Sequence, residues 1–213
     1  MANFDFVYFL MTVTVLILSI TVHEWAHAVT ADAMGDPLPR SQGRVTLWPP
    51  AHLDPAGTVM MLFTVIAGFG LGWGKPVQSN PDAYTKFPKR VAGFLVVGAG
   101  PLSNLVIATV LAQILRWGIV QDEFYLTWLS IAVQMNIGLC LFNLLPIGPL
   151  DGSKLLSYSL PPAMGVPFLR YAEKYGPTVL LIMVMAPALG IPSPLRFVLG
   201  PASMAMYYYM TGM

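Results

Sequence analysis

Long, nearly continuous apolar stretches alternate with short polar segments along the chain. Three of them, at about 4–33, 91–117 and 124–145, hold the roughly 20 apolar residues that a helix needs to cross a bilayer. The segment 175–213 carries two shorter apolar runs separated by GIPSPLR. We therefore expect three membrane-spanning helices followed by a C-terminal helical hairpin or two irregular helices.

The segments after the first predicted span have a less clear hydrophobic pattern. Residues 35–55 are polar and rich in proline and glycine, and GRVTL within them alternates as a short β-strand does. An apolar, glycine-rich patch covers 56–72, and a polar segment then begins with WGKPVQ. The pattern predicts an all-α polytopic membrane protein with a small β-strand or re-entrant insertion after the first helix. We expect one membrane-embedded domain over 1–213, with a core at about 4–155 and C-terminal helices at about 175–213.

Composition supports a membrane protein. The chain is 56% hydrophobic and 10% charged, with a mean hydropathy of +0.66, well above the value for a soluble domain of this length. Its net charge of +1 provides no basic patch, so we do not expect a nucleic-acid partner. The partner that we expect is the lipid bilayer. Cys140, the single cysteine, lies in an apolar span, where we expect a small buried hydrophobe.

Two histidines and a glutamate interrupt the first apolar stretch in the sequence ITVHEWAHAV, residues 20–29. His23 and His27 are four residues apart and share one face of a helix, close enough to hold one metal ion. Glu24, on the neighbouring flank, is placed to take a proton from water. Because an unpaired acidic residue at the centre of a membrane helix costs about 3 kcal/mol, a metal site is the favoured interpretation.

A catalytic zinc site needs a third protein ligand beyond two histidines. Asp151 stands out among the candidates because it follows NLLPIGPL at the broken end of a predicted span, although it would also serve as a helix N-cap. The other aspartate and histidine candidates are Asp32, Asp36, His52, Asp54 and Asp82.

Three motifs occur in a characteristic order: HEWAH at 23–27, AGPLSN at 99–104 and NLLPIGPLDG at 143–152. They resemble the signature segments of the site-2 protease family of intramembrane zinc metalloproteases. GRVTLWPPAHLDPAGT and GWGKPV further resemble the compact bacterial branch, without a PDZ or CBS domain. The resemblance implies one Zn²⁺ per chain held by His23, His27 and Asp151, with Glu24 as general base. It also implies a catalytic role for Asn143, as hydrogen-bond donor to substrate or to a developing oxyanion.

A transmembrane substrate must unwind before its peptide carbonyl can be attacked, and an exposed strand edge can pair with the unwound segment. WGKPVQ is our candidate edge, with an ordinary loop as the equal alternative, so substrate binding is expected at Gly74, Lys75, Pro76 and Val77. Asn104 is a further substrate-binding candidate. It could instead brace the metal site or tie two membrane helices together.

The distance in sequence between the ligands constrains the topology. If His23, His27 and Asp151 bind one ion, the first span and the 124–145 span must run in the same direction, so 56–72 should not cross the membrane. Residues 35–90 then share one side and carry most of the positive charge, which places that side and the active site toward the cytoplasm of a bacterial-type cell membrane. The charged residues of that side are Arg40, Arg44, Lys75, Lys86, Lys89 and Arg90.

The expected activity is hydrolysis of peptide bonds in transmembrane substrates. A membrane metal transporter is one alternative, but it would need several buried ligands strung across the bilayer, and the other spans supply almost none. A proteolytically silent scaffold is another, but a scaffold has no need of a general base at Glu24.

Overall fold

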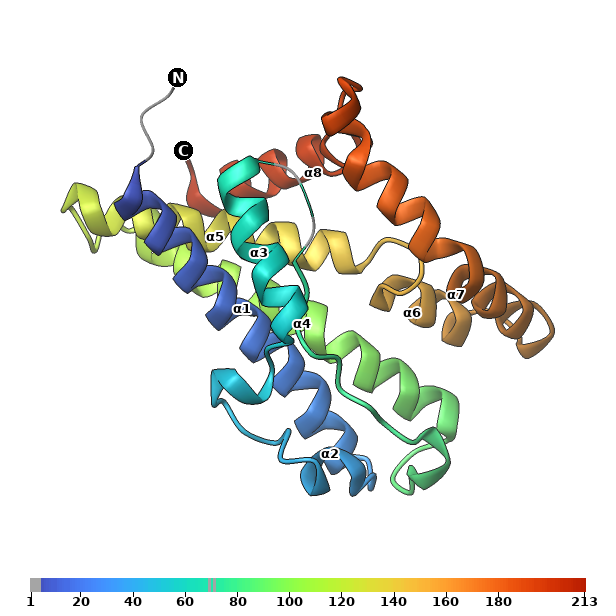
Figure 1. Ribbon diagram of the computed structural model, residues 1–213. Coiled ribbons are helices and arrows are strands. Elements are labelled where there is room, and N and C mark those ends of the chain that lie inside the picture. The colour runs from blue at the N-terminus through green and yellow to red at the C-terminus, as the bar shows by residue number, and fades with distance from the viewer. Residues whose placement is uncertain (1–4, 69, 71) are drawn as a thin grey trace.

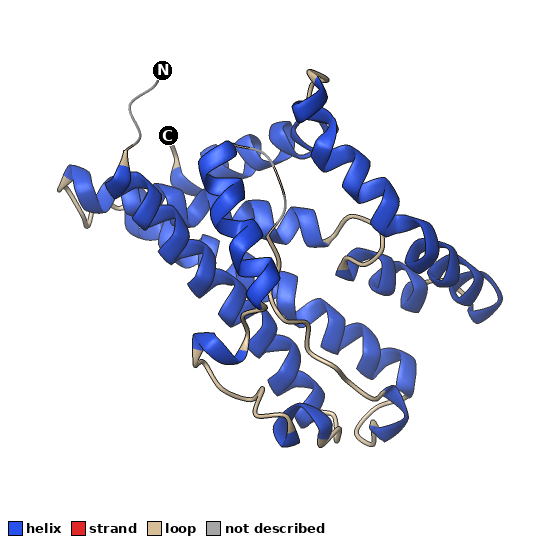
Figure 2. Cartoon of the chain, in the orientation of Figure 1, coloured by secondary structure: helices blue, strands red, loops and turns tan. Residues whose placement is uncertain are grey.

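The computed structural model describes residues 5–68, 70 and 72–213, and these fold into helices joined by short loops (Figures 1 and 2). The helices, in chain order, are α1 (Phe6–Ala33), α2 (Leu38–Ser41), η1 (Pro49–Ala51), α3 (Pro55–Ala67), η2 (Pro81–Ala83), α4 (Lys89–Arg116), α5 (Glu123–Asn143), α6 (Asp151–Ser159), α7 (Pro162–Met185), η3 (Ala186–Leu189) and α8 (Pro194–Thr211).

Helices α1, α4 and α5 are long and apolar enough to cross a membrane. They contain 28, 28 and 21 residues, and at about 1.5 Å rise per residue even α5 reaches roughly 30 Å, the thickness of the hydrocarbon core. The three predicted spans are confirmed to within two residues at the ends that the structure describes; Phe4 lies outside the described residues. Two aspartates begin spans as N-caps: Asp5 accepts from the Tyr8 amide, and Asp122 from the Phe124 amide.

Helix α4 packs against both α1 and α5, and small residues permit this close approach. Ala108 and Ala112 of α4 are fully buried against Val133 and Ile137 of α5. Tyr207 of α8 joins the same cluster, so the C-terminal helix packs on the α4–α5 pair. These contacts hold the three spans as one rigid support for the residues between them.

The apolar patch after the first span forms α3, which is too short to cross the membrane as a helix. Its 13 residues rise about 20 Å, compared with roughly 30 Å of hydrocarbon. Asp54 caps its N-terminus by accepting from the Gly57 amide, and Gly68 ends it with φ of +75°, a left-handed conformation that suits glycine. The length of α3 agrees with the expectation that this patch does not cross.

The predicted β-strands are wrong: among the described residues the only β-pairing is an isolated antiparallel bridge between Leu53 and Gly74. The segment after Gly74 is extended, and the Lys75 amide still donates to the His52 carbonyl at 2.8 Å, but the amides of Val77 and Asn80 bond to side chains instead of a neighbouring strand. Val77 donates its amide to Glu24 of α1 at 3.0 Å, and Asn80 donates its amide to Asp36 at 2.6 Å. Pro76 has no amide hydrogen to donate. A ladder therefore cannot continue beyond the bridge.

Of the two alternatives for the C-terminal segment, the hairpin is wrong, whereas two irregular helices agree with the structure. Helix α7 begins at Pro162, ahead of the predicted start at 175, and α8 is bent away from the α7–η3 helix by 95° instead of returning beside it. Gly190 turns the chain with φ of +74°, and Pro192 and Pro194 follow. Helix α8 then buries Tyr207 against α4 and α5, and these contacts favour the corner over an antiparallel pair.

Candidate metal centre

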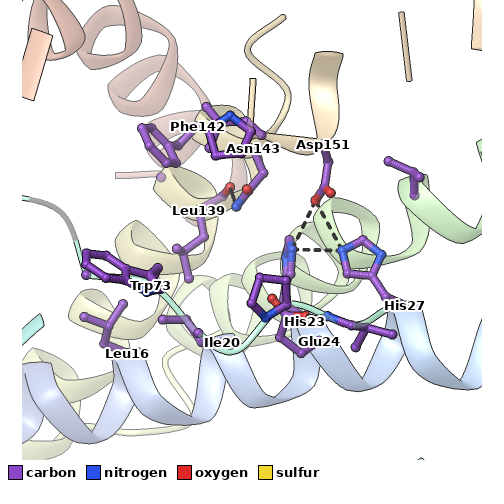
Figure 3. Close-up of a pocket in the computed structure, with 18 of the residues that line it drawn as sticks. Leu16, Ile20, His23, Glu24, His27, Trp73, Leu139, Phe142, Asn143 and Asp151 are labelled. Atoms are coloured by element: carbon purple, nitrogen blue, oxygen red, sulfur yellow. Dashed lines mark hydrogen bonds and ion pairs between the residues drawn. The ribbon is translucent and has the colours of Figure 1, made fainter. Parts of the chain in front are cut away.

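His23, His27 and Asp151 meet although 124 residues separate the last two along the chain. The histidines are one turn apart on α1, and Asp151 reaches them from the first turn of α6, just past the end of α5 (Figure 3). Asp151 Oδ2 lies 3.2 Å from Nε2 of each histidine, and the two Nε2 atoms are 3.1 Å apart. The C-terminal ends of α1 and α5 therefore lie close to the same cluster, as the predicted topology requires.

The donor set and its surroundings fit a zinc ion. One ligand atom from each of the three residues lies within 4.8 Å of the others, and no further residue joins the group in the described part of the chain. Two imidazole nitrogens and one carboxylate oxygen are a zinc set that leaves a fourth position open. Gly100 of α4 faces this cluster, since a Cβ there would lie 2.3 Å from His27 Nε2 and 2.7 Å from His23 Nε2. Only a glycine leaves the histidine nitrogens free.

Both imidazoles are oriented by partners on α4. His27 Nδ1 lies 2.8 Å from the Val96 carbonyl oxygen, which can only accept, so Nδ1 carries the hydrogen and Nε2 presents its lone pair. His23 Nδ1 lies 2.7 Å from Asn104 Oδ1 and is oriented in the same way. Partners of this kind set the tautomer and ring direction of metal-binding histidines.

Asn104 belongs to a buried chain of amides and does not line the cavity. It is 0% exposed, and its Nδ2 donates to Asn136 Oδ1 at 2.9 Å. Asn136 Nδ2 donates in turn to Ser19 Oγ, also at 2.9 Å. Of the roles considered for Asn104, bracing the site and tying helices together match this position. A direct substrate contact does not, because no surface is available.

Glu24 lies beside the cluster, in the wall of the same cavity. Its Oε2 accepts the Val77 amide at 3.0 Å and lies 3.9 Å from Arg44 Nη2. Burial lowers the pKa of the Arg44 guanidinium, and the negative charge of Glu24 opposes that shift. The carboxylate thus meets both a buried cation and the backbone of the extended segment.

The cavity beside the cluster has a volume of about 980 Å³ and is walled by α1, α3, α4, α5, α6, α7 and the segment between α3 and α4. Of the four residues of this segment predicted to bind substrate, Gly74, Pro76 and Val77 line the cavity and Lys75 does not. Asn143 lines it from the end of α5, where its Nδ2 donates to the Leu139 carbonyl at 3.0 Å (Figure 3).

The other ligand candidates have structural partners elsewhere. Asp54 caps α3, and His52 Nε2 lies 2.6 Å from the Thr46 carbonyl. Asp32 pairs with Arg40 at 2.6 Å, Asp82 pairs with Lys89, and Asp36 accepts from the Leu38 and Asn80 amides.

Four residues around the site were missed from the sequence: Arg44, Val96, Gly100 and Asn136. Asn136 carried a usable signal, because an amide within an apolar span needs a buried partner just as Glu24 does. Val96 contributes only its backbone carbonyl, which no side-chain pattern can indicate.

Comparison with known proteins points to one family. The profile of peptidase family M50 matches residues 119–187. YwhC of Bacillus subtilis, named as a zinc metalloprotease, is 38% identical over 187 residues, which cover 82% of this chain and 80% of YwhC. Rip2 of Mycobacterium tuberculosis, also named as a zinc metalloprotease, is 31% identical over 186 residues, covering 85% of this chain and 69% of Rip2. No solved structure matches the chain. The chain therefore belongs to peptidase family M50, the site-2 protease family of membrane zinc metalloproteases.

Proposed function

We propose that the protein hydrolyses peptide bonds of transmembrane substrates at one Zn²⁺ per chain, held by His23, His27 and Asp151. The convergence of three ligand atoms within 4.8 Å of one another, at the wall of a cavity that also contains Glu24, carries this proposal. The names of the M50 relatives support zinc as the metal.

The chain supplies the proton transfers. When bound, zinc polarises the scissile carbonyl and makes water a better nucleophile at neutral pH. Glu24 accepts a proton from that water and delivers it to the leaving amine nitrogen. Asn143 donates a hydrogen bond to the substrate carbonyl oxygen once its amide turns from Leu139 toward the cavity.

The extended segment beside Glu24 borders the substrate path. Gly74, Pro76 and Val77 line the cavity, so an unwound substrate segment would lie against them. This placement keeps the substrate backbone close to Glu24, because Val77 already contacts that carboxylate.

We further propose that the site lies nearer the cytoplasmic face of the membrane. Gln42 Nε2 donates to Gln78 Oε1 at 2.8 Å, so the loops before and after α3 lie together, on the side rich in lysine and arginine. Cysteine variants at Gln42 and Ser79 should be labelled from the same, cytoplasmic side. Labelling from opposite sides would contradict this topology.

The function is tested with Glu24→Gln, which keeps the size of the side chain and removes the base. We expect one zinc per chain to remain and cleavage of a single-span membrane peptide to fall by about 10²-fold or more. Glu123→Gln, on an exposed glutamate at the start of α5, is the matched control and should cleave normally. Full cleavage by Glu24→Gln, or purified protein without zinc, would refute the proposal. A transporter would retain its flux in this variant.

A further inference from the structure

Arg44 is a buried cation that neither metal binding nor proton transfer uses. It is 3% exposed, and its Nε has no hydrogen-bond partner in the part of the chain that the structure describes. Burying a charged side chain is costly unless nearby groups compensate for the lost water. A guanidinium in this position therefore needs an explanation beyond filling space.

The contacts of Arg44 form a closed ring with Glu24. Its Nη2 donates to the Lys75 carbonyl and lies 3.9 Å from Glu24 Oε2. Two residues further on, the Val77 amide donates to that same Oε2 at 3.0 Å. Arg44 thus contacts the carboxylate directly and also holds the segment that contacts it from another direction.

The backbone at Lys75 is held from two sides. Its amide donates to the His52 carbonyl at 2.8 Å, and its carbonyl accepts from Arg44. Without Arg44, one of these anchors is lost and Val77 is free to move relative to Glu24. A single nitrogen, Nη2, makes both contacts, so the charged nitrogen of lysine could restore part or all of them, whereas the neutral amide of glutamine cannot supply the charge.

We propose that Arg44 is a positioning residue that holds the Glu24 carboxylate and the Lys75–Val77 backbone in the geometry needed for proton transfer. This inference rests on the proposed proteolytic function and on Glu24 as its base. Because Arg44 touches none of the three metal ligands, its loss should affect turnover and leave zinc binding intact.

The test compares Arg44→Gln and Arg44→Lys with Arg40→Gln. Arg40 is four residues away in α2, is exposed and pairs with Asp32, so its variant controls for loss of an arginine from the same connection between α1 and α3. The substrate is the synthetic single-span peptide that the unaltered protein cleaves fastest from a panel, in detergent micelles. We expect Arg44→Gln to keep one zinc per chain, to lower kcat by about tenfold or more and to change KM by no more than about twofold. Arg44→Lys should recover part or all of the loss, and Arg40→Gln should match the unaltered protein.

Unchanged kcat in zinc-loaded Arg44→Gln would overturn the inference, as would a raised KM alone or loss of zinc from folded protein. If Arg44→Gln does not accumulate, Arg44→Met, which also removes the charge, is measured in its place, and unchanged kcat there has the same meaning. Glu24→Gln separates the two proposals. If it abolishes cleavage while Arg44→Gln, or Arg44→Met in its place, remains fully active, the proteolytic function stands and the role of Arg44 falls.

Discussion

Replacing Gly100 with alanine should strongly weaken zinc binding while leaving the fold intact. The added Cβ would lie 2.3 Å from His27 Nε2, 2.5 Å from His27 Cε1 and 2.7 Å from His23 Nε2. To reach the 3.4 Å of an ordinary contact, the His27 ring would have to move by about 1 Å. Metal–ligand distances tolerate only about 0.2 Å, so the expected displacement is roughly five times too large. We expect zinc affinity to fall by about 100-fold or more, beyond the usual effect of disturbing an outer-shell partner.

Gly98→Ala is the control for this experiment. It makes the same change in the same helix, but its Cβ would lie 3.6 Å from Leu155 Cδ2, an ordinary contact. Zinc affinity is measured by competition with a chelator, and thermal unfolding of both metal-free variants checks the fold. Since alanine is a better helix former than glycine, the change in helix propensity should not destabilise either metal-free variant. If Gly100→Ala bound zinc as tightly as Gly98→Ala, the assignment of Nε2 of both histidines as the ligand atoms would be refuted.

Three further outcomes follow from the packing. Asn136→Leu should lower zinc affinity by about tenfold, because Asn104 loses the acceptor that orients it toward His23, and an unchanged chelator competition would contradict this. Burial lowers the pKa of His52 below its usual 6.5, so the unfolded chain takes up a proton there before the folded one does. The thermal unfolding temperature of metal-free protein should therefore fall as pH drops below about 6.5, and less so in His52→Asn. Tyr207→Ala should lower the free energy of unfolding by about 3 kcal/mol, whereas Tyr209→Ala, 84% exposed, should not.

Much of the architecture follows from the hydrophobic pattern. The three spans could be predicted because their length and apolarity are imposed by the bilayer and need no knowledge of packing. The start of helix α7 could not be predicted, because two consecutive prolines, Pro161 and Pro162, suggest a break in the helix. In the structure they begin a helix, and Pro162 occupies its first position, where proline is tolerated. The bend before α8 depends on where Tyr207 is buried, which is a tertiary contact that no local pattern contains.

The cluster of His23, His27 and Asp151 was predictable, and the surroundings of Glu24 were not. His23 and His27 share a helix face, and Asp151 belongs to a motif with a recognised order, so sequence and resemblance together predict the cluster that the structure brings together. The segment after Gly74 has a strand-like composition, but the amide hydrogens of Val77 and Asn80 meet Glu24 and Asp36, which precede them by more than 40 residues. Such long-range side-chain contacts compete with strand pairing and leave no local signal.

The polar chain behind His23 links the metal site to the assembly of the membrane helices. It begins at Ser19 on α1, passes through Asn136 on α5 and Asn104 on α4, and returns to α1 at His23. Lipid provides no hydrophobic driving force between helices, so small residues and buried hydrogen bonds of this kind must contribute to their association. An amide suits the two middle positions because it donates and accepts at once without adding a charge. The same four side chains therefore hold three spans together and fix the His23 ring, so a substitution that loosens the bundle here should also weaken the metal site.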